Sequence, residues 1–475
     1  MKTKSLFALL IILCLSLSLF ACSDNNSNSG RKEKLSKTAM TINNTNINAL
    51  EFQIYFHTVY NNFLNSTSGG SNYGLDSSKS LNEQSCGIAG YTNMTWAQYF
   101  SKSTESYCQE LYGIVAEANA ESYEMTQEEK DSLSKQTESF KESMKNDAKA
   151  NNQCEEESIA TLYGKDVTYE DIQKANTNMA LYSSYINAKT VKSYTDEEIN
   201  DYYQQNKNNI DTLTLRVAPI FYITDPSQNN PYGYENKETA LEKANEFASR
   251  VTSEESYLQL LDEYMNDKVK EYYGSSDYTM SKNVDYSTFS NDPEGVSWAF
   301  DENRVKGDIK VIDNKSSYLV VFYISRDTKD YNYVDVRDIL VKDLSDLGKK
   351  KAEDIYNEWR NGTQTEESFA KLAEKYSEDT GSNKNGGLYT NRGKGDFVEA
   401  LDEWCFNPDR KPGDNEVIFG KYGYYIMYYS KSGSNARKTL VEKAIQNERY
   451  SSLVKSVIEK YPYTTYISVM LSVIS

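Results

Sequence analysis

One stretch near the C-terminal end, residues 333–430, constrains the fold most. Its apolar residues follow first the pattern of a strand, then that of helices, and finally that of a hairpin. The β-rich apolar run from Val334 to Val341 predicts a strand. Apolar residues then recur three times at the spacing i, i+3, i+4 and i+7, which predicts three amphipathic helices. These helices are expected at residues 352–359, 369–376 and 397–404. Two short apolar runs, 417–419 and 424–429, flank a Gly-containing turn and predict a closing β-hairpin.

Several short motifs within this stretch resemble those of a known family. In chain order they are YSED-GS (376–382), the Gly pair 386–387, Trp404-x-Phe406, Gly413-Asp414 and Tyr422-Gly-Tyr424. With these landmarks in this order, residues 333–432 resemble the parvulin-type peptidyl-prolyl isomerases. The resemblance implies an α+β domain in which helices cover an antiparallel sheet.

A second, diverged copy of this unit precedes it. WAFDENRVKGDIKVI, from Trp298, matches WCFNPDRKPGDNEVI, from Trp404, at its Trp, Phe, Arg, Gly, Asp, Val and Ile positions. ESYLQLLDEY, from Glu255, likewise matches ESFAKLAEKY, from Glu367. Residues 213–327 are therefore predicted to form a degenerate parvulin-like domain, which lacks the YSED-GS and Gly-Gly elements.

The first residues are typical of an exported lipoprotein. Lys2 and Lys4 precede an apolar run that is too short for a membrane-spanning helix and that ends in Ala21-Cys22. Residues 1–21 are predicted to be a signal peptide, and Cys22 to be lipidated; ordinary cleavage beside an incidental cysteine is the alternative. Residues 22–37, which include SDNNSNSG, are predicted to be a flexible tether. The protein is then expected at the cell membrane, lipid-anchored on the extracytoplasmic face.

Residues 38–208 are predicted to form a helical N-terminal domain. The domain opens with a β-like piece, a turn at Asn43-Asn44 and a helix, which resembles the entry of exported parvulin foldases. Thr126, Thr168 and Thr195 each stand three residues before an acidic residue, as in helix capping boxes. The polar residues 129–157 are interpreted as a solvated helix on an extended arm, and the Gly/Ser-rich residues 66–90 as a loop.

The last segment, residues 436–475, is predicted to be helical, with a break at Pro462 before an apolar end. This end is too short to span a membrane and is expected to be buried in another domain. By analogy with chaperones of this general plan, the segment is expected to return to the helical N-terminal domain.

Composition narrows the function. A net charge of −18 argues against nucleic acid as a partner, and 40 tyrosines offer large amphipathic surfaces for packing or for binding chain segments. The cysteines of the mature chain have no zinc-site spacing, and neither a metal nor a cofactor is expected. A disulfide among Cys86, Cys108 and Cys154 and buried thiols, including Cys405, are open alternatives. His57, the only histidine, lies among aromatic residues and is predicted to be a helix residue rather than a ligand or base.

The parvulin resemblance implies a proline-binding site. The family site has an apolar seat for the proline ring beside a Cys or Asp and two histidines. In this sequence Asp379 matches the Cys or Asp position. Phe397 and Leu401, on one face of a predicted helix, match the apolar seat, and Leu388 lies near a further apolar position. The alternative for Phe397 and Leu401 is that they are ordinary core residues.

Both family histidines are absent. Asp338 and Tyr425 stand in their places, and Pro219 and Leu319 do so in the other copy. Asp379, Tyr425 and Asp338 are therefore the catalytic candidates. The copy at residues 213–327 has lost both polar partners and is expected to be structural or a binding module.

The chain as a whole resembles the PrsA family of exported foldases. This implies a membrane-anchored foldase and chaperone that binds unfolded or newly exported polypeptides at X-Pro segments. Peptidyl-prolyl isomerisation is then confined to residues 333–432. The competing interpretation is a non-catalytic holdase with the same fold. Client proteins and oligomeric state are left open.

Overall fold

The computed structural model describes residues 27–223, 233–264, 268, 276–289 and 292–474. The chain divides into two compact units, one made of the residues up to Ser193 together with those from Gln446, and the other of Tyr194–Ile445. No helix within the described ranges is long and apolar enough to cross a membrane. Cys22 lies outside the described residues.

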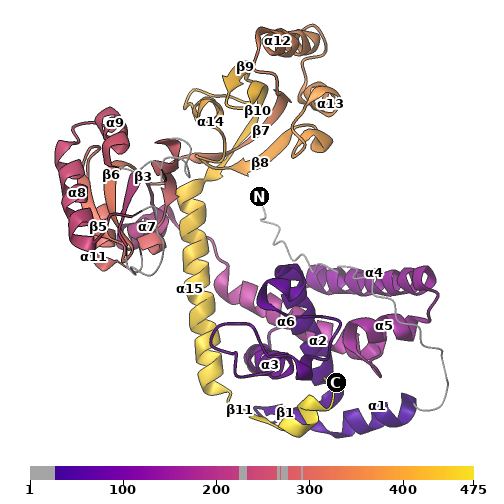
Figure 1. The fold of residues 1–475 in the computed structure, drawn as a ribbon. Helices are drawn as coiled ribbons and strands as arrows, with labels where there is room; N and C mark the ends of the chain where they lie inside the picture. The colour runs from indigo at the N-terminus through magenta and orange to yellow at the C-terminus, as the bar shows by residue number, and fades with distance from the viewer. Residues whose placement is uncertain (1–26, 224–232, 265–267, 269–275, 290–291, 475) are drawn as a thin grey trace. The chain divides into compact units, whose positions relative to one another are not determined.

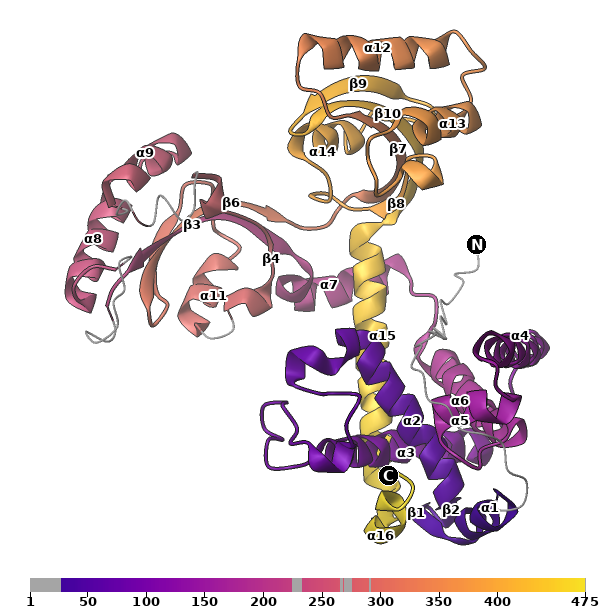
Figure 2. The same ribbon diagram turned by 45° about the vertical axis from the view of Figure 1, so that its right-hand side comes forward.

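The first unit is mainly helical (Figure 1). Its elements are α1 (Ser27–Ser36), β1 (Thr38–Ile42), β2 (Thr45–Asn48), α2 (Ala49–Ser66), α3 (Trp96–Ala120), α4 (Gln127–Asn151), α5 (Glu155–Tyr163), α6 (Tyr169–Thr190), the end of α15 (Ala436–Lys460), β11 (Tyr463–Thr465) and α16 (Ile467–Leu471). Two 3-10 turns, Ser68–Tyr73 and Leu81–Glu83, lie in the predicted loop. Helices α2, α3 and α6 pack together (Figures 1 and 2). Their core is aromatic: Trp96 and Phe100, both fully buried, stack with ring centres 5.4 Å apart.

Local signals in this unit predicted its elements well. Asn43 and Asn44 adopt positive φ angles of 45° and 62°, which suit the two-residue turn between β1 and β2. Capping boxes are present at Thr126 and Thr168, where helices α4 and α6 begin. A third, at Thr195, opens α7 (Asp196–Ile210) of the second unit. These expectations are confirmed.

The C-terminal segment completes this unit. Strand β11 pairs antiparallel with β1, with Met40 opposite Thr465, and Met470 of α16 is fully buried in the core of the unit. The predicted return of the chain end is confirmed. Its apolar end is buried in part: Met470 and Val473 are buried, whereas Ile467 is 63% exposed.

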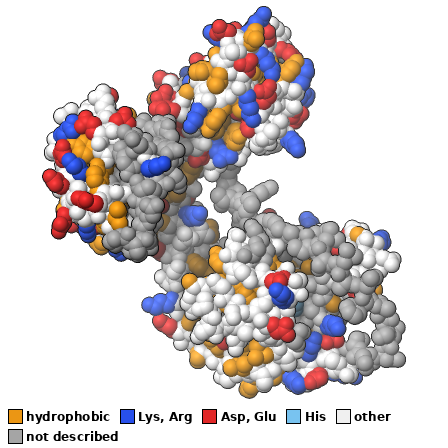
Figure 3. Space-filling model, in the orientation of Figure 1, with side chains coloured by type: hydrophobic (Ala, Val, Ile, Leu, Met, Phe, Trp, Pro, Cys, Tyr) orange, Lys and Arg blue, Asp and Glu red, His pale blue; other side chains and the backbone are white. Residues whose placement is uncertain are grey.

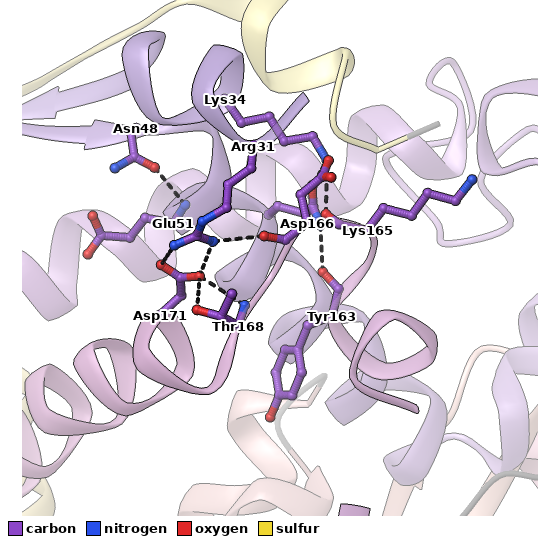
Figure 4. Close-up of polar contacts among 10 residues, drawn as sticks. Arg31, Lys34, Asn48, Glu51, Tyr163, Lys165, Asp166, Thr168 and Asp171 are labelled. Carbon is purple, nitrogen blue, oxygen red and sulfur yellow. Dashed lines mark hydrogen bonds and ion pairs between the residues drawn. The ribbon is translucent and has the colours of Figure 1, made fainter. Parts of the chain in front are cut away.

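Two predictions for this unit are wrong. Residues 27–36, assigned to a flexible tether, form helix α1. Arg31 forms an ion pair with Asp171 and donates to the Asp166 carbonyl at 2.8 Å, while Lys34 Nζ lies 2.8 Å from the Asp166 carboxylate (Figure 4). These charge-assisted contacts hold a segment that has few apolar residues to bury.

Helix α4 also differs from its expectation, because it is not an extended arm. Phe140 and Met144 are buried on one side of it, and the Phe140 ring contacts Tyr163 and Tyr169 of α5 and α6. A narrow apolar stripe is therefore enough to dock this otherwise polar helix.

The second unit begins with α7 (Asp196–Ile210) and contains two four-stranded antiparallel sheets. The first domain comprises β3 (Thr212–Phe221), α8 (Lys237–Arg250), α9 (Glu254–Tyr264), β4 (Met280–Val284), α11 (Pro293–Ala299), β5 (Ile309–Asp313) and β6 (Ser317–Asp327). The second comprises β7 (Asn332–Val341), α12 (Asp346–Arg360), α13 (Glu366–Tyr376), β8 (Leu388–Arg392), α14 (Glu399–Cys405), β9 (Asn415–Gly420) and β10 (Gly423–Asn435). The strand orders β4-β3-β6-β5 and β8-β7-β10-β9 are equivalent. The α+β fold class is confirmed.

The two domains share side-chain landmarks as well as strand order. Arg304 lies over the Trp298 ring, and Arg410 lies over the Trp404 ring. Gly307 and Gly413 have φ angles of 102° and 95°, and their N–H groups donate to equivalent tyrosine carbonyls on β6 and β10. The internal repeat seen in the sequence is therefore present in the fold.

In the second domain, helices α12 and α13 cover one face of the sheet and α14 the other (Figure 2). On the face shown in Figure 3, acidic and basic side chains are intermixed over this domain. Sequence reasoning missed strand β8 and extended the third helix too far. Helix α14 begins at Glu399, so Phe397 precedes it. The four cysteines Cys86, Cys108, Cys154 and Cys405 are thiols rather than disulfides.

Candidate functional site

The candidate site lies on the α14 face of the second sheet. Asp338 of β7 is opposite Met427 of β10, and Tyr425 is opposite Leu340, so the four side chains share one face. Asp338 is 4% exposed and Tyr425 is 6% exposed. The sheet therefore brings together the two residues that stand where the family histidines are expected.

Asp379 reaches the same place from the loop between α13 and β8. Its carboxylate accepts hydrogen bonds from the Gly381 N–H at 3.1 Å, from the Tyr389 hydroxyl at 2.7 Å and from Ser382. The Ser382 Oγ also lies 3.0 Å from Asp338 Oδ1. Ser382 thus stands between the two carboxyl groups.

The Gly386-Gly387 pair allows this loop to approach β7. Gly387 has a φ of 70°, and a Cβ added there would lie 2.1 Å from the Asp338 carbonyl oxygen. The Asp338 N–H donates to the Gly387 carbonyl at 2.9 Å. A side chain at position 387 would break this contact, which explains why glycine is needed in the motif.

The two carboxyl groups have opposite pKa shifts because their surroundings differ. Burial, with a smaller effect of the Asp379 charge, raises the pKa of Asp338 to about 7, although the Ser382 hydrogen bond acts in the opposite direction. Burial also acts to raise the pKa of Asp379, but hydrogen bonds from Ser382, Tyr389 and Gly381 outweigh it and lower that pKa. Burial and the charge of Asp338 raise the pKa of Tyr425 to about 12. At neutral pH the site therefore holds an ionised Asp379, a half-protonated Asp338 and a neutral Tyr425.

Of the three apolar residues expected at the site, Phe397 and Leu401 lie there and Leu388 does not. Leu401 is 3% exposed and belongs to the same apolar cluster as Tyr425, while Phe397 is half-buried and packs edge-on against Tyr389 with ring centres 5.8 Å apart. Leu388 is opposite Arg337, whose side chain pairs with Glu366 of α13. Leu388 is thus in register with the other face of the sheet and does not join the candidate site.

Two residues of the site were missed from the sequence. Ser382 lies within the YSED-GS motif, so the motif itself could have indicated it. Tyr389 is opposite Val336 and reaches the site only because β8 exists, and β8 was not expected.

The first domain lacks this arrangement. By strand register, the position equivalent to Asp338 is Val217, which is opposite Val321 as Asp338 is opposite Met427. The sequence assignment of Pro219 was two residues off, whereas Leu319 does stand at the position of Tyr425. An apolar pair therefore replaces both polar residues in this domain.

The described residues contain no cluster of three or more His, Cys, Asp or Glu side chains that could hold a metal ion. His57 lies on α2, and burial together with the nearby Lys34 charge lowers its pKa to about 4. The place of His57 on α2 agrees with its interpretation as a helix residue.

Known proteins show similarity to the part of the chain that contains the site. Residues 319–431 match the family model described as the PPIC-type PPIase domain. Foldase protein PrsA 4 of Bacillus cereus is 27% identical over 234 residues, which cover 47% of this chain and 74% of that protein. Foldase protein PrsA 1 of Listeria monocytogenes is 26% identical over 135 residues, which cover 26% of this chain and 43% of that protein. The chain thus spans less than half the length of that second relative.

Among solved structures, the peptidylprolyl isomerase PrsA from Bacillus cereus is similar to this chain. The sequence identity is 16%, the TM-score is 0.23, and the match covers 60% of this chain and 97% of that one.

Proposed function

We propose that the second α+β domain, whose residues 319–431 match the PPIC-type PPIase domain, binds X-Pro segments and accelerates their cis–trans isomerisation to a small extent. The observation that carries the proposal is the meeting of Asp338, Asp379 and Tyr425 beside Leu401 on one sheet face. An apolar surface beside a short polar network suits a proline ring and its adjoining amide.

The reaction needs no covalent step. Rotation about the X-Pro bond faces a barrier of roughly 18 to 20 kcal/mol, and it is accelerated when a site binds the twisted amide better than either planar form. Phe397, which is half-buried, would contact the proline ring, and Leu401, which is 3% exposed, would support this surface from beneath. Asp379, the less buried carboxylate, would present a fixed negative charge beside the rotating amide. Acceleration is expected to be small because Asp338 and Tyr425 replace both histidines.

The remainder of the chain would anchor the protein and assist the folding of other polypeptides. Lipidation of Cys22 would anchor the protein at the outer face of the cell membrane. The helical unit would act as a chaperone for newly exported polypeptides, and the first domain, with Val217 and Leu319 at the key positions, would only bind or support. The alternative is a holdase that binds the same chains without isomerising them.

The test compares Phe397→Ala with Phe419→Ala in the full chain. Phe419 is 57% exposed and its neighbour across the hairpin, Tyr424, packs on the α12 side, so Phe419 is a matched aromatic control outside the site. A fluorescent X-Pro peptide should bind the wild type and Phe419→Ala equally and bind Phe397→Ala more weakly. Equal binding by all three proteins would contradict the proposed pocket.

A further inference from the structure

Ser382 lies between the carboxyl groups of Asp338 and Asp379. If both acids are ionised, its single hydroxyl hydrogen is too few for two hydrogen bonds. A serine hydroxyl carries a single hydrogen, so it donates to one acceptor at a time. Its Oγ nevertheless lies within hydrogen-bonding distance of both Asp338 Oδ1 and Asp379 Oδ2. Both contacts are hydrogen bonds only when one carboxyl group is protonated.

The surroundings decide which carboxyl group holds that proton. Asp379 already accepts from the Tyr389 hydroxyl and the Gly381 N–H, both of which favour its ionised form. Asp338 is almost fully buried, and its carboxyl group contacts the Ser382 hydroxyl at 3.0 Å. The proton therefore belongs on Asp338, which donates to Ser382 Oγ while Ser382 donates to Asp379.

The other titratable groups around Asp338 do not supply a compensating positive charge. They are Tyr389 of β8, Cys405 of α14 and Tyr425 of β10, each of which is neutral near pH 7 because burial raises its pKa. The Lys342 charge acts on Asp379 and not on Asp338. Loss of the proton would thus leave two negative carboxylates competing for one hydroxyl in a buried place.

We propose that Ser382 is a positioning residue that joins Asp338 and Asp379 into a dyad sharing one proton, and that the dyad orders the proline site only in its protonated state. This inference rests on the proposed binding of X-Pro segments by the second domain. Above the pH at which the proton leaves, repulsion would displace the loop that carries Asp379. Below that pH, Asp379 would be held in place by Ser382 and Tyr389 and would face the peptide.

The burial of Asp338 places the transition near neutral pH, because its pKa is raised to about 7. A carboxyl group in water would instead titrate near pH 4. The site would therefore bind X-Pro segments best in a mildly acidic medium.

Two measurements on the full chain test this inference. The first is the Kd of a fluorescent X-Pro peptide between pH 5.5 and 8.5 for the wild type, Asp338→Asn, Ser382→Ala and Thr380→Ala. Thr380 is an exposed hydroxyl residue in the same loop and serves as the control. The second is the titration of aspartate carboxyl groups by ¹³C NMR, with the Asp338 signal identified by its loss in Asp338→Asn.

The wild type and Thr380→Ala should bind about fivefold or more weakly at pH 8.5 than at pH 6. Asp338→Asn, whose amide can donate to Ser382 at every pH, should show a nearly constant Kd. In Ser382→Ala, binding at low pH should weaken and the Asp338 titration should move to lower pH, because the protonated Asp338 loses the hydroxyl that accepts its proton. A pH-dependence retained in Asp338→Asn, or an Asp338 signal that titrates near pH 4, would overturn the dyad. If no protein binds the peptide at any pH, the proposed function fails, and the NMR titration still decides whether the dyad holds a proton.

Discussion

The guanidinium of Arg410 lies 4.1 Å from the centre of the Trp404 ring, and its Nε donates to the Trp404 carbonyl at 3.1 Å. The same pair recurs as Arg304 over Trp298 in the first domain, at 5.4 Å. In each domain the arginine follows the short helix that covers one sheet face, so it fixes the chain between that helix and the next strand.

Replacement of Arg410 should therefore destabilise the second domain. The loss of a cation–π contact and a hydrogen bond predicts that Arg410→Ala lowers the free energy of unfolding by about 1 to 2 kcal/mol. Lys411→Ala, at an exposed neighbouring position, is the control. Hydrogen exchange of β9 and β10 in the full chain measures the difference. Equal protection in both variants would show that the stacked arginine is energetically neutral.

Helix α1 should depend on Arg31. The side chains of Arg31 and Asp171 are 25% and 17% exposed, so their ion pair is only partly screened by water. Arg31→Ala should release α1 and make the chain between α1 and β1 more sensitive to limited proteolysis, whereas Lys32→Ala, at an exposed position, should not. Unchanged cleavage of Arg31→Ala would mean that Lys34 alone holds the helix.

Gly387 should not tolerate a side chain. Its φ of 70° and the 2.1 Å approach of an added Cβ to the Asp338 carbonyl predict that Gly387→Ala costs more than about 2 kcal/mol. Gly362→Ala is the matched control, because an added Cβ there meets no atom closer than 3.3 Å. Urea unfolding of the second domain, followed by hydrogen exchange of β7, compares the two. A Gly387→Ala protein as stable as Gly362→Ala would contradict the described loop.

The raised pKa of Asp338 predicts a pH-dependent stability. The unfolded chain loses this proton near pH 4 and the folded chain near pH 7, so the folded state binds more protons between these values. The stability of the second domain should therefore fall as pH rises from 4 to 7, by roughly 4 kcal/mol from this group, and then level off. Asp338→Asn should remove that slope. Hydrogen exchange of β7 and β10, corrected for the intrinsic effect of pH, measures it; the same slope in Asp338→Asn would assign it to another group.

Sequence patterns predicted most of the fold, because its elements are specified locally. The capping threonines, the Asn43-Asn44 turn and the apolar periods of α12 and α13 all act within a few residues. The internal repeat predicted the sheet of the first domain, since equivalent Trp, Arg and Gly residues imply equivalent contacts.

What the sequence could not supply were contacts between distant residues. The docking of α1 depends on Asp166 and Asp171, more than 130 positions away. The short strand β8 has too few apolar residues to show a period, so the register that directs Tyr389 to the site and Leu388 away from it was invisible. The sequence named Asp338, Asp379 and Tyr425 as candidates, but the hydrogen bond from Ser382 to Asp379 could be found only from the three-dimensional fold.

NMR exchange spectroscopy of an X-Pro peptide mixed with the full chain measures whether the second domain isomerises prolyl bonds. We predict a measurable increase in the cis–trans exchange rate with the wild type, its loss in Phe397→Ala, and a further increase in the double variant Asp338→His, Tyr425→His. If the wild type leaves the exchange rate at its uncatalysed value while still suppressing client aggregation, the proposed isomerisation is contradicted and the protein is a holdase.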